Sequence, residues 1–140
     1  MAVRIAIAIA AFAVLAGVAW WLERRRRTDA PTQSSTALPA QLDRHDFVRP
    51  DAPWLVALFT SANCDSCAGL IDKAAPLESP DVAVTELEFP AARALHDRYH
   101  IAAAPTTLVA DADGVVRASI VGAFNATDLW NALAELRDAG

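Results

Sequence analysis

An unbroken apolar run at residues 5–22 dominates the N-terminal part of the chain. A helix over this run would be about 27 Å long at 1.5 Å per residue, close to the hydrocarbon thickness of a bilayer. Trp20 and Trp21 lie near the end of the run, where indole rings favour the headgroup layer, and four arginines follow at 24–27. The pattern predicts one transmembrane helix, with residues 1–27 as a membrane anchor and its basic flank.

Two alternatives accompany this prediction. The first is a cleaved signal peptide with a small-residue cleavage site at residues 17–19, but the arginine block would then lie at the new N-terminus and oppose export. The second concerns orientation. More arginines follow the run than precede it, so the positive-inside rule places the rest of the chain in the cytoplasm. The opposite, extracytoplasmic orientation is the alternative.

Residues 28–41 are polar, contain Pro31 and Pro39, and have no apolar period. This composition is typical of a flexible linker. The folded domain is then expected over residues 42–140, which is long enough for one modest core.

The first half of this domain alternates between strand and helix patterns. The apolar run at 54–59 predicts a buried, parallel strand, and alternating apolar positions predict a second strand at 82–89. Helical spacing over 64–75 predicts a helix between these strands. Pro90 suits the first turn of another helix, over 91–99.

The second half predicts a hairpin and a closing helix. Strands are expected at 106–110 and 115–121, joined by a turn at 111–114 that contains Asp-Gly. Thr127 is expected to cap a last helix that ends at Arg137. Together these elements predict an α/β fold, a three-layer sandwich with a mixed sheet, preceded by the transmembrane helix.

Charge and composition exclude some classes of protein. The net charge is −5 at pH 7, and after residue 29 there are 7 basic and 15 acidic residues. A nucleic-acid-binding domain needs an excess of lysine and arginine on its folded part, so that class is excluded. Two cysteines exclude a scaffold with several disulfides. Arginine outnumbers lysine 11 to 1, which is typical of a GC-rich bacterial genome.

The motif Cys64-Asp65-Ser66-Cys67 lies at a predicted strand-to-helix junction. Two thiols on the first turn of a helix face one another and can close a disulfide. Backbone N–H groups at a helix start would favour the thiolate of Cys64, and the thiolate is the species that attacks a disulfide. Cys67, further into the turn, would be more buried and would resolve the mixed disulfide. A C-x-x-C motif beside a βαβ pattern therefore predicts redox activity.

Three further segments follow the cysteine motif: Tyr-His-Ile-Ala-Ala-Ala-Pro-Thr at 99–106, Asp-Gly-Val at 113–115 and Val-Gly-Ala at 121–123. In this order and at these distances, the chain resembles the thioredoxin family across nearly all of residues 45–140. The resemblance implies a thioredoxin-like fold and a thiol–disulfide oxidoreductase that needs no cofactor or metal. Its partners would be protein thiols and disulfides, together with an unidentified electron donor or acceptor.

The resemblance also implies roles for the loop before the third strand. Pro105 would be a cis-proline facing the cysteines, because the family holds this minority isomer through its fold. Ala104 would offer backbone groups that pair with a substrate strand, and Thr106 would belong to the same substrate-binding loop.

Three positions depart from ordinary thioredoxins. Asn63 replaces the tryptophan before the first cysteine, and Asp65-Ser66 replaces Gly-Pro between the cysteines. Leu58 replaces a buried acid of the central strand that helps proton transfer to the resolving thiol. Asp65 places a negative charge beside Cys64 and should raise the pKa of its thiol. We therefore expect a weaker thiolate, and exchange that is slower or relies on water.

Two other functions are weighed against redox exchange. His96 and His100 share a predicted helical face and could form a Cys/His metal site with the cysteines, although their distance from Cys67 exceeds the usual finger spacing. They are expected to be surface residues, as is His45. The domain could also be a non-catalytic docking module at the membrane, in which case replacing both cysteines would leave its binding unchanged.

Overall fold

The computed structural model describes Val18 and residues 37–139. The predicted transmembrane run, residues 5–22, lies outside this part of the chain apart from Val18, so the anchor stays a prediction. Among the residues that are described, no helix combines the length and the apolar character needed to cross a bilayer. The chain divides into two compact units, Met1–Ser35 and Thr36–Gly140, and all of the elements below belong to the second.

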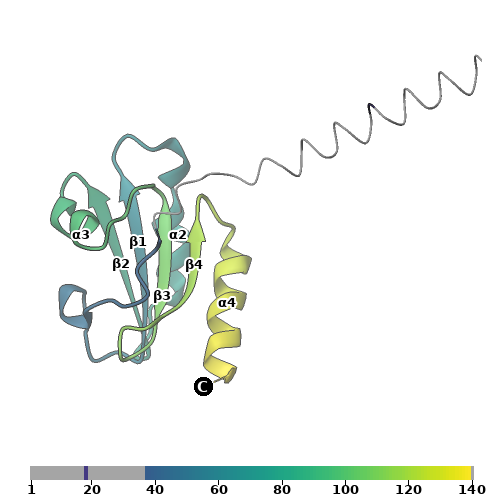
Figure 1. Ribbon diagram of the computed structural model, residues 1–140. Helices are drawn as coiled ribbons and strands as arrows, with labels where there is room; N and C mark the ends of the chain where they lie inside the picture. Colours follow the sequence, from purple (N-terminus) through teal and green to yellow (C-terminus); the bar gives the residue numbers. More distant parts are fainter. Residues whose placement is uncertain (1–17, 19–36, 140) are drawn as a thin grey trace, which may run out of the picture. The chain divides into compact units, whose positions relative to one another are not determined.

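A four-stranded mixed sheet forms the middle layer, in the order β2-β1-β3-β4 (Figure 1). The strand β1 (Trp54–Ser61) runs parallel to β2 (Val82–Phe89) and antiparallel to β3 (Thr106–Ala110). The strand β4 (Val116–Val121) pairs antiparallel with β3. The predicted mixed sheet, with one parallel pair and a terminal hairpin, is therefore confirmed.

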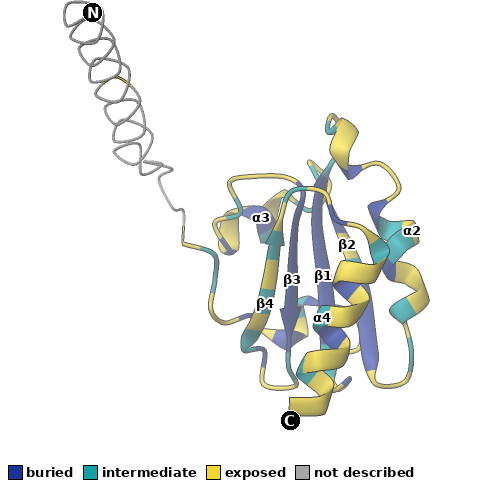
Figure 2. Cartoon of the chain, turned by 90° about the vertical axis from the view of Figure 1, so that its right-hand side faces the viewer, coloured by how far each residue is buried: buried dark blue, intermediate teal, exposed yellow. Residues whose placement is uncertain are grey.

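The central strands β1 and β3 are buried almost throughout. Six consecutive residues of β1 and all five residues of β3 are buried, because both faces of these strands are covered (Figure 2). In β4, by contrast, half-buried and exposed residues alternate, as an edge strand with one covered face requires.

Each face of the sheet carries its own apolar cluster. One cluster contains Leu55, Ala57 and Phe59 from β1, and side chains around α3 (Arg93–Arg98) pack against it. The other contains Val56 and Leu58 from β1, packed against residues of α2 (Leu70–Ala74) and α4 (Ala126–Ala139). The three layers of the sandwich follow from this alternation along one strand.

The helix predicted over 64–75 is wrong as a continuous element. The chain instead forms the 3₁₀ turn η2 (Asp65–Cys67), reverses at Gly69 with φ +71°, and only then enters α2. A second 3₁₀ turn, η3 (Ala75–Leu77), follows α2. The apolar spacing continues through the break, since Cys67, Leu70 and Ala74 are all buried. Periodicity alone therefore could not reveal the interruption.

The two later helices begin at other residues than the sequence predicted. The helix α3 starts at Arg93, after Pro90, whose peptide bond with Phe89 is cis. The helix α4 is capped by Asn125 rather than Thr127, because the Asn125 side chain accepts a hydrogen bond from the amide of Asp128 (2.9 Å).

The folded unit also begins earlier than the sequence predicted. Leu38 packs against the first apolar cluster, and the amide of Val116 donates to the carbonyl of Ala40 (2.9 Å). Residues 38–41, expected to be the end of the linker, therefore belong to the fold, because they pair with the chain at the start of β4.

Tyr99 connects the end of α3 to the 3₁₀ turn η1 (Arg44–Asp46). Its hydroxyl accepts a hydrogen bond from the amide of Asp43 (3.0 Å) and donates one to the carboxylate of Asp46. Burial raises the pKa of Tyr99, and the hydrogen bond to Asp46 raises it further. This contact holds η1 against the sheet face that α3 covers.

The turn between β3 and β4 generates a stability prediction at Gly114, which has φ +79°. A Cβ atom there would overlap the carbonyl oxygen of Leu42, whereas a Cβ at Gly69 would meet no atom within 4 Å. Gly69→Ala should therefore lose only about 1–2 kcal/mol for its left-handed backbone. Gly114→Ala should lose about 3 kcal/mol or more, since the overlap adds to that cost. Urea unfolding of the full-length chain measures both, and equal losses would contradict the role of the overlap.

Candidate active site

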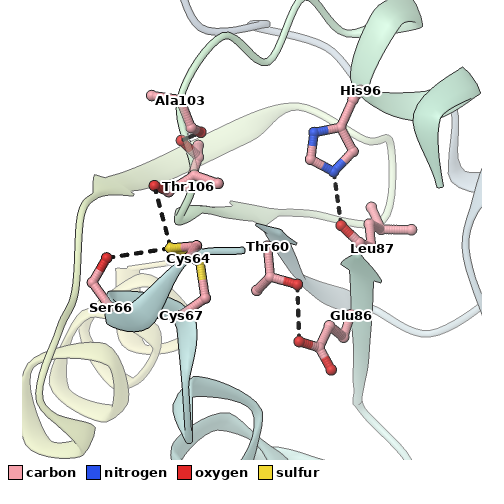
Figure 3. Close-up of a disulfide and its surroundings, with 10 residues drawn as sticks. Thr60, Cys64, Ser66, Cys67, Glu86, Leu87, His96, Ala103 and Thr106 are labelled. Carbon is pink, nitrogen blue, oxygen red and sulfur yellow. Dashed lines mark hydrogen bonds between the residues drawn. A yellow bond between two sulfur atoms is a disulfide. The ribbon is translucent and has the colours of Figure 1, made fainter. Parts of the chain in front are cut away.

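Cys64 and Cys67 form a disulfide just beyond the end of β1 (Figure 3). Their Cα atoms are 5.3 Å apart. The amide of Cys64 donates to the carbonyl of Ser61 (3.1 Å), the last residue of β1, so the central strand positions the pair directly.

The two sulfur atoms differ in accessibility. Cys67 is 7% exposed, whereas Cys64 is partly exposed and borders the exposed residues Asn63 and Asp65. A thiol or disulfide of another protein can therefore reach Cys64 but not Cys67.

Two oxygen atoms lie beside the Sγ of Cys64 and would act on a thiolate in opposite ways. The hydroxyl of Ser66 is 3.3 Å away and can donate a hydrogen bond to a thiolate, which favours the charged form. The carbonyl oxygen of Ala104 is 3.7 Å away and can only accept, so it favours the protonated thiol.

The expected helix start behind Cys64 is absent. Cys64 precedes η2, a 3₁₀ turn of three residues, and the chain leaves the helical conformation at Gly69. A helix dipole needs several aligned peptide groups, so it stabilises a Cys64 thiolate far less than the sequence predicted. This correction points in the same direction as the charge of Asp65 beside the cysteine.

The loop before β3 lies against the disulfide. The Ala104–Pro105 peptide bond is cis, Ala104 is exposed, and Pro105 is buried. The hydroxyl of Thr106 donates to the carbonyl of Ala103 (2.8 Å), and the amide of Gly122 donates to the carbonyl of Pro105 (2.8 Å). The loop is thus held at two points, and the Thr106 side chain is used inside it, while the backbone of Ala104 faces Cys64.

The sequence analysis did not find a polar pair below the cysteines. The hydroxyl of Thr60 on β1 donates to the carboxylate of Glu86 on β2 (2.9 Å). Leu58, the position where thioredoxins carry an acid, is 1% exposed and pairs in register with Glu86. The strand pattern predicted β2 but gave no role to Glu86, because its contact with Thr60 depends on the register of the two strands.

The prediction that His96 is a surface residue is wrong. His96 is 6% exposed, and its Nε2 atom lies 2.8 Å from the carbonyl oxygen of Leu87. Its ring packs edge-on against Phe59 and Phe89, so the aromatic residues of the sheet bury it. His100 is exposed. Within residues 37–139, no group of three or more His, Cys, Asp or Glu side chains is placed to hold a metal ion.

Comparison with known proteins identifies the fold. No family model and no curated protein matches the sequence. Among solved structures, the germline-specific thioredoxin Deadhead of Drosophila melanogaster is 23% identical, with a TM-score of 0.54 over 62% of this chain and 84% of that one. A mutant thioredoxin from Halobacterium salinarum is 26% identical, with a TM-score of 0.52 over 59% and 73%. StoA from Bacillus subtilis is 15% identical, with a TM-score of 0.50 over 59% and 84%. The chain therefore has a thioredoxin-like α/β fold, and this fold with its C-x-x-C pair supports a thiol–disulfide oxidoreductase.

The contact between Ser66 and Cys64 generates a prediction about the reduced chain. Ser66→Ala removes the only side-chain hydroxyl in hydrogen-bond contact with the Sγ of Cys64 among the described residues, so less thiolate should form at neutral pH. Alkylation of reduced Cys64 should slow by about two- to fivefold, and the midpoint of its pH dependence should move upward.

Asp65→Asn is the matched control, because it removes a neighbouring negative charge and should move the alkylation midpoint downward. A Ser66→Ala variant that reacts like the unaltered chain would show that the hydroxyl does not contact the thiolate in the reduced state.

Proposed function

We propose that this chain exchanges thiols and disulfides with protein substrates through Cys64 and Cys67. The observation that carries the proposal is the asymmetry of the pair: an accessible Cys64 beside the Ala104 carbonyl and a buried Cys67, joined in a disulfide at the end of the central strand. The thioredoxin-like fold supports the same activity.

The reaction has two displacement steps. In the reduced chain, the thiolate of Cys64 attacks one sulfur of a substrate disulfide, forms a mixed disulfide and releases the other substrate sulfur, which takes up a proton. Cys67 then loses its proton and attacks the Sγ of Cys64. The bond to the substrate breaks, the second substrate thiol leaves, and two electrons have passed from the cysteine pair to the substrate. No cofactor takes part.

Ala104 is proposed to align the substrate. It is exposed, and its carbonyl oxygen lies 3.7 Å from the sulfur that attacks. An extended substrate segment can pair with this backbone in the manner of an added strand. Pro105 is buried and has no N–H to offer a substrate, so its proposed role is to shape the loop. The hydrogen bond from Thr106 to Ala103 holds the loop in place.

We propose that electrons flow from the pair to the substrate, which makes the protein a reductant. A cysteine pair is a strong oxidant when its reduced form is stabilised. Here the charge of Asp65, the carbonyl of Ala104 and the break at Gly69 all leave the Cys64 thiolate weakly stabilised. The disulfide form is favoured instead, so the reduced form readily gives up its electrons.

We also propose that the domain is tethered to a bacterial membrane by a single helix over residues 5–22. The apolar run and the arginines that follow it support this proposal, and by the positive-inside rule the domain lies in the cytoplasm. That compartment keeps thiols reduced, which agrees with a reductant. An extracytoplasmic domain is the alternative, and the electron donor is unidentified.

The activity is tested with a protein disulfide substrate and a chemical reductant. The full-length chain should accelerate reduction of the substrate, and Cys64→Ser should abolish the acceleration because the attacking thiolate is lost. Cys67→Ser should instead accumulate a mixed disulfide with the substrate. The potential of the pair should lie near that of thioredoxin, about −270 mV.

A potential near −120 mV, like that of strong oxidants, would contradict the direction of electron flow. If the variant with both cysteines replaced kept the activity of the unaltered chain, the redox function itself would be rejected, and a docking role would remain.

The topology is tested by labelling Cys64 in bacterial cells with a membrane-impermeant thiol reagent. We expect the protein in the membrane fraction and labelling only after the cells are permeabilised, because the domain lies inside. A chain with both cysteines replaced by serine is the control for background. Labelling in intact cells would establish the extracytoplasmic orientation, and recovery of the chain in the soluble fraction would contradict the anchor.

A further inference from the structure

In the second displacement step the Cys67 thiol needs a proton acceptor, and the cysteine pair alone does not provide one. Cys67 must become a thiolate before it attacks the mixed disulfide, yet it is 7% exposed, and apolar surroundings favour the protonated thiol. Leu58 lies on the sheet face that α2 covers, and its side chain has no group that can accept a proton. The proton must therefore reach an acceptor elsewhere, a question that rests on the function proposed above.

The sheet face that α2 covers carries such an acceptor. Leu70 and Ala74, which follow Cys67 in the chain, pack in one cluster with Val56 and Leu58. Side chains alternate along a strand, so Thr60 lies on the same face as Leu58 and one pleat closer to the cysteines.

Thr60 connects the buried interior to a carboxylate. It is 1% exposed, and its hydroxyl donates to the Oε1 atom of Glu86 (2.9 Å). Glu86 is exposed, on β2 at the edge of the sheet. In the view of Figure 3, the Thr60 side chain is drawn between Cys67 and the carboxylate of Glu86, and its hydroxyl points to Glu86. A hydroxyl in this place can accept a proton on one side and donate one on the other.

We propose that Glu86 accepts the proton of the Cys67 thiol through the hydroxyl of Thr60. As Cys67 attacks, its S–H proton passes over one water molecule to the Thr60 oxygen, while the Thr60 hydroxyl proton passes to the Glu86 carboxylate. The Cys67–Cys64 bond forms, the bond from Cys64 to the substrate breaks, and the substrate leaves as a thiolate. Glu86 then releases the proton to solvent. Thr60 and Glu86 are positioning residues, since they act through Cys67 and do not touch the substrate.

A neighbouring carboxylate supplies the matched control. Glu88 lies two residues further along β2, is exposed, and pairs in register with Thr60. Among the described residues, however, the Thr60 hydroxyl donates to Glu86 and not to Glu88. Replacing either glutamate by glutamine removes one negative charge from the same strand, so a difference between the two variants reports the contact rather than the charge.

The experiment separates the two displacement steps in the reduced full-length chain. The probe is dithiobis(nitrobenzoate), an aromatic disulfide that releases one coloured thiolate when Cys64 attacks and a second when Cys67 resolves the mixed disulfide. In Glu86→Gln the first release should keep its rate, and the second should slow by about tenfold or more. In Glu88→Gln both releases should keep their rates.

The pH profile of the second release distinguishes proton transfer from a merely structural effect. With an internal acceptor the rate should change little between about pH 6 and 8, whereas without one it should rise by about tenfold per pH unit as hydroxide takes over. Thr60→Val should show the profile of Glu86→Gln. Thr60→Ser, which keeps the hydroxyl, should show that of the unaltered chain.

Each outcome has a distinct meaning. Equal slowing in Glu86→Gln and Glu88→Gln, or a Glu86→Gln profile that matches the unaltered chain, would overturn the proton-transfer role and leave the redox function intact. If the unaltered chain released only the first thiolate, Cys67 would not resolve the mixed disulfide, and the proposed function would fail together with this inference.

Discussion

The pairing of β1 on both edges, together with its burial on both faces, is the constraint on which the rest of the structure depends. The strand pairs with β2 on one side and with β3 on the other, and its alternating side chains belong to the two apolar clusters in turn. The disulfide follows directly after the last residue of β1, and the Ala104 loop, which precedes β3, lies at the same end of these strands. The site therefore lies at the end of a fully covered central strand, the kind of element that opens least readily.

Groups close to Cys64 have opposing effects on the stability of its thiolate. Ser66 can stabilise a thiolate, whereas the Ala104 carbonyl and Asp65 oppose one, and the break at Gly69 removes most of the helix dipole that would also stabilise it. The same carbonyl that disfavours the thiolate is the group that we propose aligns a substrate. In the proposed function, substrate alignment is combined with a cysteine pair that favours the disulfide form, which is the combination a reductant needs.

The sheet face below Cys67 shows how a polar function can be combined with an apolar core. Leu58 contributes to the cluster under α2, and the hydroxyl and carboxylate of Thr60 and Glu86 lie beside it, toward the open edge of the sheet. A carboxylate at the edge avoids the cost of burying a charge, while the buried hydroxyl that contacts it extends its reach inward. The burial of His96 on the opposite face follows the same rule, because its ring nitrogen is paired with the Leu87 carbonyl.

The sequence by itself determined the parts that depend on local pattern. Alternating and continuous apolar positions located β2 and β3 at their observed bounds, and the C-x-x-C spacing located the disulfide. Tertiary structure decided the rest, because contacts between distant segments leave no local signal. Gly69 interrupts the helix without disturbing its apolar spacing, and aromatic residues of two strands bury His96. The contact of Thr60 with Glu86 exists only because β1 and β2 pair in a particular register, and register is a property of the assembled sheet.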